Sequence, residues 1–190
     1  AQGVEIRKGD FVIVRTGHQE RCLAAGDWTG YAGGDAPGLA FETAHWIKAN
    51  DIAAMAAEGA KLVWSPRSNI DLYGQTADII TYRRLGVTIG LGTDWVISGS
   101  MNMLRELACA DYLNTNRYDG AFSDFELWRM ATAGGAATLG VGDRLGDLAA
   151  DRIADIAIFD ASQGQKNWRA ILEASPAEVS LVLRGGQPLY

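Results

Sequence analysis

The chain has 190 residues, 48% of them hydrophobic, which is enough to bury the core of one domain with a small appendage. Lys and Arg total 17 against 23 Asp and Glu, so the net charge of −6 offers no counterion-release drive toward nucleic acid and no basic patch for a membrane. The apolar runs are far shorter than the roughly 20 residues of a spanning helix. We therefore expect a globular, cytoplasmic protein that acts on a small molecule.

The first half of the chain predicts strands that alternate with helices. Strands are predicted at residues 11–15, 61–64 and 87–91, and helices at residues 39–48, 52–58 and 71–85, the last after a short loop. Gly26 to Gly38 is too rich in glycine for a regular element. Asp51 can cap the alanine-rich helix that follows it, and Pro66 ends the strand before it because proline cannot donate to a ladder.

The second half predicts helices at residues 102–113 and 123–139, then strands at residues 154–160 and 178–184. Ser123 and Glu126 have the spacing of a capping box at a helix start. The alternation in the first half favours parallel strands with helices packed on the sheet. We expect the strand Phe11–Arg15 to join Leu62–Trp64 and Val87–Leu91 in one parallel sheet, and a homo-oligomer that covers an open edge of it.

Residues 61–190 carry a series of motifs in a fixed order. They are Trp64-Ser65-Pro66-Arg67-Ser68-Asn69, Leu72-Tyr73-Gly74, Leu91-Gly92-Thr93-Asp94-Trp95, Met103-Leu104-Arg105-Glu106-Leu107, Leu145-Gly146-Asp147-Leu148 and Val182-Leu183-Arg184-Gly185-Gly186. This part of the chain resembles the second half of a metal-dependent amidohydrolase of the chlorohydrolase and imidazolonepropionase-like kind. The resemblance implies an α/β fold with a partial β/α barrel, followed by short C-terminal β strands.

Residues 1–56 resemble a different family, the cyclase family that includes bacterial kynurenine formamidases and isatin hydrolases. The resemblance rests on Gly9-Asp10 before the strand at residues 11–15, and on Pro37-Gly38-Leu39 and Glu42-Thr43-Ala44. Together the two resemblances predict a chimera with three parts. These are a cyclase-like fragment at 1–56, an amidohydrolase half-barrel at 57–145 and a C-terminal β appendage at 146–190, with the N-terminal strand and helix completing the partial barrel.

The amidohydrolase resemblance implies that Asp94 ends a barrel strand, binds zinc or manganese and takes a proton from the attacking water. A catalytic zinc needs about three protein ligands, and one carboxylate does not hold it. His18 follows the first predicted strand and could reach the same sheet edge as Asp94, which makes both candidate catalytic residues. A strand-end carboxylate that caps a helix, a loop histidine on the surface and a protein without metal stay open as alternatives.

Five further residues are candidates for substrate binding at the mouth of the partial barrel. They are Ser65, Arg67, Asn69, Tyr73 and Trp95. Arginine and asparagine can orient a substrate by hydrogen bonds, and the two aromatic rings can wall it. The same residues could instead simply end a strand and cap a helix.

Two main functions follow from these observations, and a binding module that uses Trp95 and Tyr73 is a third, lesser possibility. The first is a hydrolase that cleaves an amide, ester or related bond of a small molecule, weakly or in a repurposed form, at the carboxyl ends of the strands. The alternative is a recombinant of two enzyme fragments that folds but retains no catalytic activity.

Overall fold

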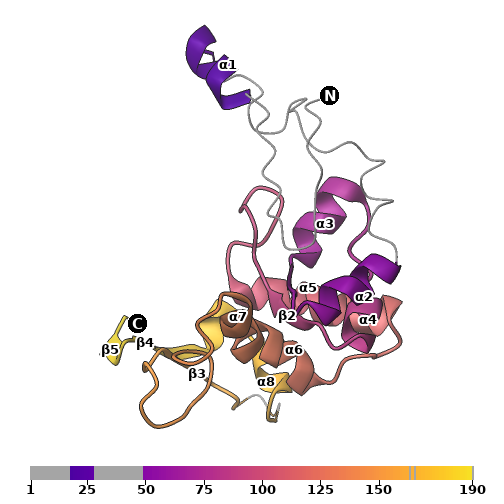
Figure 1. The fold of residues 1–190 in the computed structure, drawn as a ribbon. Coiled ribbons are helices and arrows are strands. Elements are labelled where there is room, and N and C mark those ends of the chain that lie inside the picture. The colour runs from indigo at the N-terminus through magenta and orange to yellow at the C-terminus, as the bar shows by residue number, and fades with distance from the viewer. Residues whose placement is uncertain (1–17, 28–48, 163, 165, 190) are drawn as a thin grey trace. The chain divides into compact units, whose positions relative to one another are not determined.

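The computed structural model describes residues 18–27, 49–162, 164 and 166–189 (Figure 1). The chain divides into two compact units, residues 1–47 and 48–190. In the first unit the described element is helix α1, His18–Ala25. The predicted strand Phe11–Arg15 and the predicted helix at residues 39–48 lie outside the described residues. His18 begins this helix, so the alternative of a loop histidine at this position is wrong.

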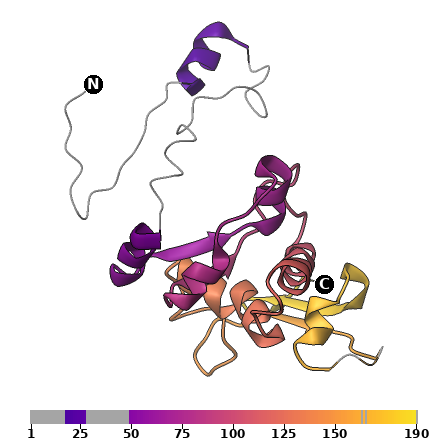
Figure 2. The same cartoon turned by 90° about the vertical axis from the view of Figure 1, so that its right-hand side faces the viewer.

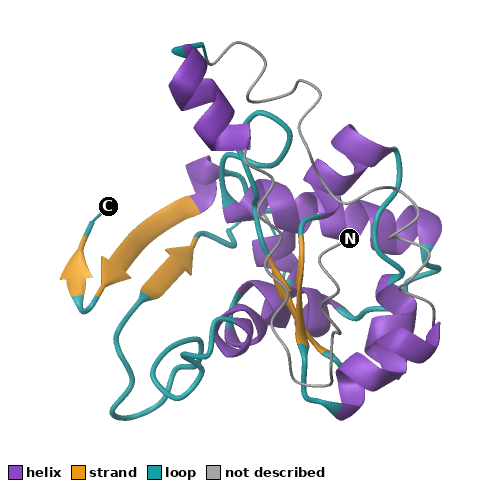
Figure 3. Cartoon of the chain, turned by 45° about the horizontal axis from the view of Figure 1, so that its top comes forward, coloured by secondary structure: helices purple, strands orange, loops and turns teal. Residues whose placement is uncertain are grey.

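The second unit contains a pair of parallel strands, β1 (Lys61–Trp64) and β2 (Thr88–Leu91), as the sequence predicts. Their register places Lys61 opposite Thr88 and Trp64 opposite Leu91. Figure 3 shows the two strands in the midst of the helices of this unit. Parallel strands need a crossover connection, and helices α3 and α4 provide it here. The predicted parallel strand–helix arrangement is therefore confirmed for these two strands.

Three helices surround the start of this unit: α2 (Ala49–Ala57), α3 (Pro66–Tyr73) and α4 (Ile79–Arg84). The helix expected at 52–58 is present as α2, but it begins at Ala49, so Asp51 lies in its first turn and the expectation that Asp51 caps it is wrong. Helix α3 begins with Pro66, which suits a first helical position, and ends at Gly74 with φ of +67°. The prediction of a loop at the start of residues 71–85 is thus wrong for residues 71–73, because they form the end of α3. The predicted helix itself is α4, whose N-cap Asp78 accepts the Thr81 N–H.

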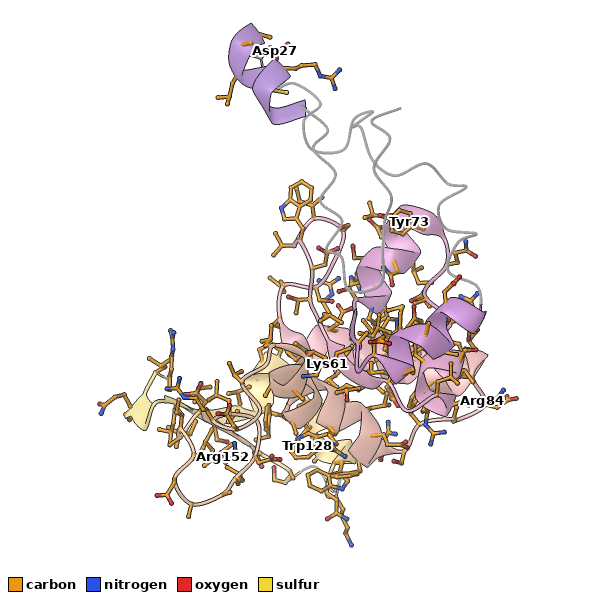
Figure 4. The ribbon with its side chains drawn as sticks, viewed as in Figure 1. Asp27, Lys61, Tyr73, Arg84, Trp128 and Arg152 are labelled. Atoms are coloured by element: carbon orange, nitrogen blue, oxygen red, sulfur yellow. The ribbon has the colours of Figure 1, made fainter. Side chains whose placement is uncertain are left out.

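The following segment forms α5 (Met103–Arg117), α6 (Asp124–Ala131) and α7 (Ala133–Thr138). The capping box of Ser123 and Glu126 is confirmed. The single helix predicted at 123–139 is broken at Thr132, where φ and ψ are −122° and −101°. The close approach of α7 to β2 accounts for the break, because a Cβ at Gly134 would lie 2.4 Å from the Ile89 carbonyl oxygen. Lys61 also joins β1 to α7 by donating to the Ala137 carbonyl at 2.6 Å (Figure 4).

The C-terminal strands β3 (Ile156–Phe159), β4 (Val179–Arg184) and β5 (Gln187–Pro188) form an antiparallel sheet, in which β3 and β4 correspond to the strands predicted at 154–160 and 178–184. This sheet stands to one side of the helices in Figure 1 and runs along the base of the unit in Figure 2. Between β3 and β4 lie helix α8 (Arg169–Leu172) and a 3-10 turn at Pro176–Glu178, which the sequence pattern did not reveal. Over the described residues, no helix is long and apolar enough to cross a membrane.

One hydrophobic core joins the parallel strands to the helices. Its fully buried side chains include Trp64 of β1, Ile79 of α4, Leu107 of α5, Leu127 of α6 and Leu172 of α8. Each such side chain contributes about 1.5–3 kcal/mol when it leaves water. The core therefore fixes α8, although α8 is only four residues long.

Arg169 of α8 links three helices through charged hydrogen bonds. Its Nη1 donates to Asp111 of α5 at 2.7 Å, and its Nε donates to Asp124 of α6 at 3.0 Å. These hydrogen bonds, first that to Asp124, raise the pKa of Arg169. The ring of Trp168 packs 4.2 Å from that of Trp128 beside this cluster, measured between centroids. Arg169 therefore holds the C-terminal segment against α5 and α6.

We expect Arg169→Met to destabilise the protein by roughly 1–3 kcal/mol, because it leaves the carboxylates of Asp111 and Asp124 without their cation. Thermal denaturation should show a melting temperature lower by several degrees. The matched control is Arg84→Met on exposed α4 (Figure 4), which should change stability by at most about 0.5 kcal/mol. Equal losses in the two variants would contradict the role given to Arg169.

Candidate functional site

The carboxyl ends of β1 and β2 meet at one edge of the parallel pair. The Gly92 N–H donates to the Trp64 carbonyl at 2.9 Å and so extends the ladder one residue beyond β2. Glycine suits this position, since a Cβ would lie 2.7 Å from Val63 Cγ1 and the Val63 side chain would have to shift. The segments that follow the two strands, beginning at Ser65 and at Gly92, are therefore neighbours. This edge is where α/β folds with parallel strands place their sites.

Asp94 lies in a tight loop after β2. Its φ of +54° is in the left-handed region, which aspartate and asparagine tolerate better than other side chains. The loop closes on itself through the Ser100 N–H, which donates to the Thr93 carbonyl at 2.9 Å. A Cβ at Gly99 would lie 2.0 Å from that same carbonyl oxygen, so only glycine fits. The closed loop presents Asp94 as an exposed carboxylate at the strand edge.

Two buried serines lie next to this carboxylate, and one of them binds it directly. Ser68, in the first turn of α3, donates from Oγ to Asp94 Oδ2 at 2.5 Å. Its Oγ also lies 3.0 Å from the Oγ of Ser98 in the Asp94 loop. The exposed fractions of Ser68 and Ser98 are 1% and 6%. The candidate site therefore consists of the exposed Asp94 carboxylate and the two buried hydroxyl groups of Ser68 and Ser98 next to it.

Behind the serines lies a fully buried carboxyl group, that of Glu106 on α5. Its Oε1 accepts the Arg67 N–H at 3.1 Å. Ser65, the N-cap of α3, makes no side-chain cap hydrogen bond, so Glu106 supplies an acceptor to this helix start from another helix. The Oε2 of Glu106 and the Oγ of Ser100 are both buried without a hydrogen bond of normal geometry.

Burial raises the pKa of Glu106, and the negative charge of Asp94 adds to the rise. The Ser100 hydroxyl and the N–H and guanidinium of Arg67 act in the opposite direction without cancelling it. Burial, with the charge of Glu106, also raises the pKa of the Cys109 thiol on the same helix. The region behind Asp94 therefore disfavours additional negative charge.

The structure places the predicted substrate-binding residues around this edge in different roles. Asn69 accepts a hydrogen bond from Thr76 at 3.0 Å, and Thr76 accepts one from the indole N–H of Trp64 at 2.7 Å, so Asn69 Oδ1 already braces α3. Ser65 and Arg67 are half-buried beside it. Tyr73, at the end of α3 (Figure 4), and Trp95, next to Asp94, are 69% and 49% exposed. Contact of these residues with a substrate stays a prediction.

The side chain of His18 is outside the described residues, so a shared site of His18 and Asp94 also stays a prediction. Within the described part of the chain, no group of three or more His, Cys, Asp or Glu side chains could hold a metal ion. Asp94 is a single carboxylate, and catalytic zinc needs about three protein ligands. The described residues by themselves therefore do not fit a catalytic zinc.

Sequence reasoning passed over Ser68, Ser98 and Glu106 as functional candidates. A signal for Glu106 was present: it shares a helical stripe with Leu107 and Ala110, and a carboxyl group on a buried stripe is rare unless it has a partner. Ser68 and Ser98 carry no such signal, because a serine in a turn is ordinary.

A separate pocket lies near the start of β2, at the opposite end from Asp94. Its lining includes Val87, Thr88, Arg129 and Met130. None of the predicted site residues belongs to it, and its other arginine, Arg83, is engaged by Glu126 at 2.8 Å. We therefore place the candidate site at the Asp94 edge.

Comparison with known proteins identifies the family of the chain. The Amidohydrolase family matches residues 3–189. The 5-methylthioadenosine/S-adenosylhomocysteine deaminase of Desulforudis audaxviator is 32% identical over 159 residues, which are 79% of this chain and 37% of that protein. The chain thus spans little more than a third of this relative.

Two solved structures are similar to this one. The adenosine deaminase of Xanthomonas campestris with bound zinc has a TM-score of 0.68 and 27% identity over 75% of this chain and 34% of that one. The atrazine chlorohydrolase of Arthrobacter aurescens in complex with zinc has a TM-score of 0.63 and 28% identity over 75% of this chain and 34% of that one. These likenesses agree with the predicted α/β fold and with the resemblance carried by residues 61–190.

The comparisons do not support a chimera. One family matches residues 3–189, and these include both sides of the junction expected near residue 56. The motifs that suggested a cyclase, such as Gly9-Asp10 before an apolar run, are only two or three residues long, and short motif matches carry a risk of false positives. The separate origin assigned to residues 1–56 is therefore corrected to a single family.

We expect the stability of the Glu106→Gln variant relative to the original protein to rise with pH. A carboxyl group with a raised pKa binds more protons in the folded chain, so its stabilising contribution is complete below its ordinary pKa of 4.5 and is lost as pH rises through the folded pKa. The melting temperatures of the two proteins should be similar at pH 4. Toward pH 7 the melting temperature of the variant should rise relative to that of the original protein.

Glu126→Gln is the control of opposite sign. Although burial acts to raise it, hydrogen bonds from Ser123 and Arg83 lower the pKa of Glu126. This variant should therefore be less stable than the original protein at pH 7, and the difference should close as pH falls. A Glu106→Gln difference that is flat with pH, or follows the sign of Glu126→Gln, would contradict the raised pKa of Glu106.

Proposed function

This chain belongs to the amidohydrolase family, and from that membership we propose that it serves the hydrolytic removal of an amino or comparable leaving group from a small molecule, with Asp94 as its acid–base group. The observation that carries the proposal is the exposed Asp94 carboxylate at the carboxyl edge of two parallel strands, held by the buried Ser68 hydroxyl at 2.5 Å. An exposed acid at this position can reach a substrate, and its fixed geometry suits proton transfer.

The proposed step is the attack of water on an electron-poor carbon. A carbon–oxygen bond forms while the carboxylate of Asp94 takes a proton from the water, and the bond to the leaving group then breaks as that group receives the proton. Zinc occurs in similar solved structures, where an ion of this kind would acidify the water. Because the described residues do not fit a zinc site by themselves, the contribution we assign to them is limited to Asp94 and the groups that hold it.

The names of the relatives suggest the substrate class. They include deaminases of 5-methylthioadenosine, S-adenosylhomocysteine and adenosine, and a chlorohydrolase of atrazine. These compounds share a nitrogen heteroaromatic ring with an amino or chloro substituent. The exposed rings of Trp95 and Tyr73 suit the faces of such a substrate. We therefore propose substituted purines or triazines as the substrate class.

The test is Asp94→Asn, assayed for release of ammonia or chloride from 5-methylthioadenosine, adenosine and atrazine, with and without added zinc. Asparagine retains the size of the side chain and tolerates φ of +54°, so the change removes the charge without straining the loop. We expect turnover to fall by about 100-fold or more, the usual contribution of a positioned acid–base group.

Asp71→Asn, which neutralises an exposed carboxylate on α3, is the matched control and should keep the original rate. Equal turnover by Asp94→Asn and the original protein would rule out the role of Asp94. No turnover of any of these substrates by the folded original protein, with metal content measured by elemental analysis, would favour the non-catalytic alternative.

A further inference from the structure

We infer that Ser68 is a positioning residue for Asp94 and that Ser98 sets the direction of the Ser68 hydroxyl. This inference rests on the function proposed for Asp94 and names the groups that orient its carboxylate. It starts from the 2.5 Å hydrogen bond from Ser68 Oγ to Asp94 Oδ2.

The bond divides the Asp94 carboxylate into two unlike oxygens. Oδ2 is occupied by the Ser68 hydroxyl, whereas Oδ1 accepts no hydrogen bond from any described residue. The carboxylate is exposed and the serine is buried, so Oδ2 faces the protein and Oδ1 remains for water or substrate. The Ser68 hydroxyl therefore determines which oxygen of Asp94 is available for proton transfer.

The hydrogen-bond chain has one direction. A serine hydroxyl carries one proton, and the proton of Ser68 is directed at Asp94. In the 3.0 Å contact between Ser68 Oγ and Ser98 Oγ, Ser98 must therefore be the donor. Because Ser98 donates to the Ser68 oxygen, the Ser68 proton remains directed at Asp94. Water competes poorly with this chain because both serines are almost completely buried.

The backbone around Ser68 is also fixed. Glu106 on α5 accepts the N–H of Arg67, the residue before Ser68, at 3.1 Å. The Asp94 loop is joined to the same edge by the Gly92 N–H and the Trp64 carbonyl at 2.9 Å. The donor Ser68 and the acceptor Asp94 thus lie on two segments that are each fixed by tertiary contacts, and these contacts set the distance between them. An arrangement of this kind holds a functional group to within a fraction of an ångström.

The experiment compares Ser68→Ala and Ser98→Ala with Ser100→Ala. Ser100 is a matched control, because it is a buried serine of the same loop whose hydroxyl acts on Glu106 and has no hydrogen bond to Ser68 or Asp94. We expect Ser68→Ala to lower kcat about 10-fold with little change in KM, since it loosens the acid without removing it. Ser98→Ala should produce a smaller loss of kcat, and Ser100→Ala none.

A measurement independent of turnover is a double-mutant cycle in thermal unfolding with Ser68→Ala, Asp94→Asn and the double variant. If the two side chains interact, the loss of melting temperature in the double variant should be smaller than the sum of the single losses by about 2 °C or more. Ser68→Thr retains the hydroxyl and should recover most of the kcat lost in Ser68→Ala.

The outcomes separate this inference from the proposed function. Loss of activity in Asp94→Asn together with an unchanged kcat in Ser68→Ala, or with additive losses of melting temperature, would overturn the positioning role and leave that of Asp94 intact. Full activity of Asp94→Asn, or no turnover by the original protein, would overturn the proposed function and the positioning role with it, even if the cycle showed coupling. A kcat loss equal in Ser68→Ala and Ser100→Ala would mark a general packing effect and contradict the inference.

Discussion

The parallel pairing of β1 and β2 is the constraint on which the site depends. With Trp64 opposite Leu91, both strands end at the same edge, and the next residues, Ser65 and Gly92, leave it side by side. Ser68 and Asp94 are 26 residues apart in sequence, yet their side chains lie within hydrogen-bond distance because of this register. A shift by one residue would turn alternate side chains to the other face and separate them.

The polar groups buried behind the site lower the stability of the protein. Glu106 is fully buried, and neither its Oε2 nor the nearby Ser100 hydroxyl, which acts on Glu106, makes a hydrogen bond of normal geometry. Groups of this kind reduce stability, and proteins retain them where they serve a purpose. Here Glu106 provides the acceptor that Ser65 does not provide at the start of α3, so the helix carrying Ser68 is fixed from α5. The apolar core around Trp64 and Leu107 offsets the loss.

The C-terminal segment supports the site from a distance. Arg169 on the short helix α8 bonds to α5 and α6, and α5 is the helix that carries Glu106. Helix α5 thus contacts both α8 of the C-terminal segment and, through Glu106, the start of α3 at the site. These contacts explain why the appendage and the parallel strands belong to one compact unit, residues 48–190. It also agrees with membership of one family across residues 3–189.

The sequence by itself determined the elements whose causes are local. The short strands at 61–64 and 87–91, the Ser123–Glu126 capping box and the Asp94 motif at a strand end could all be predicted, because each depends on neighbours a few residues away. Only the tertiary structure decided the break at Thr132, which follows from the approach of α7 to β2, and the helix α8, which its core contacts and Arg169 hold in place. The same holds for the buried group around Asp94: Ser68, Ser98 and Glu106 come from three segments, and no pattern along the chain records which hydroxyl meets which acid.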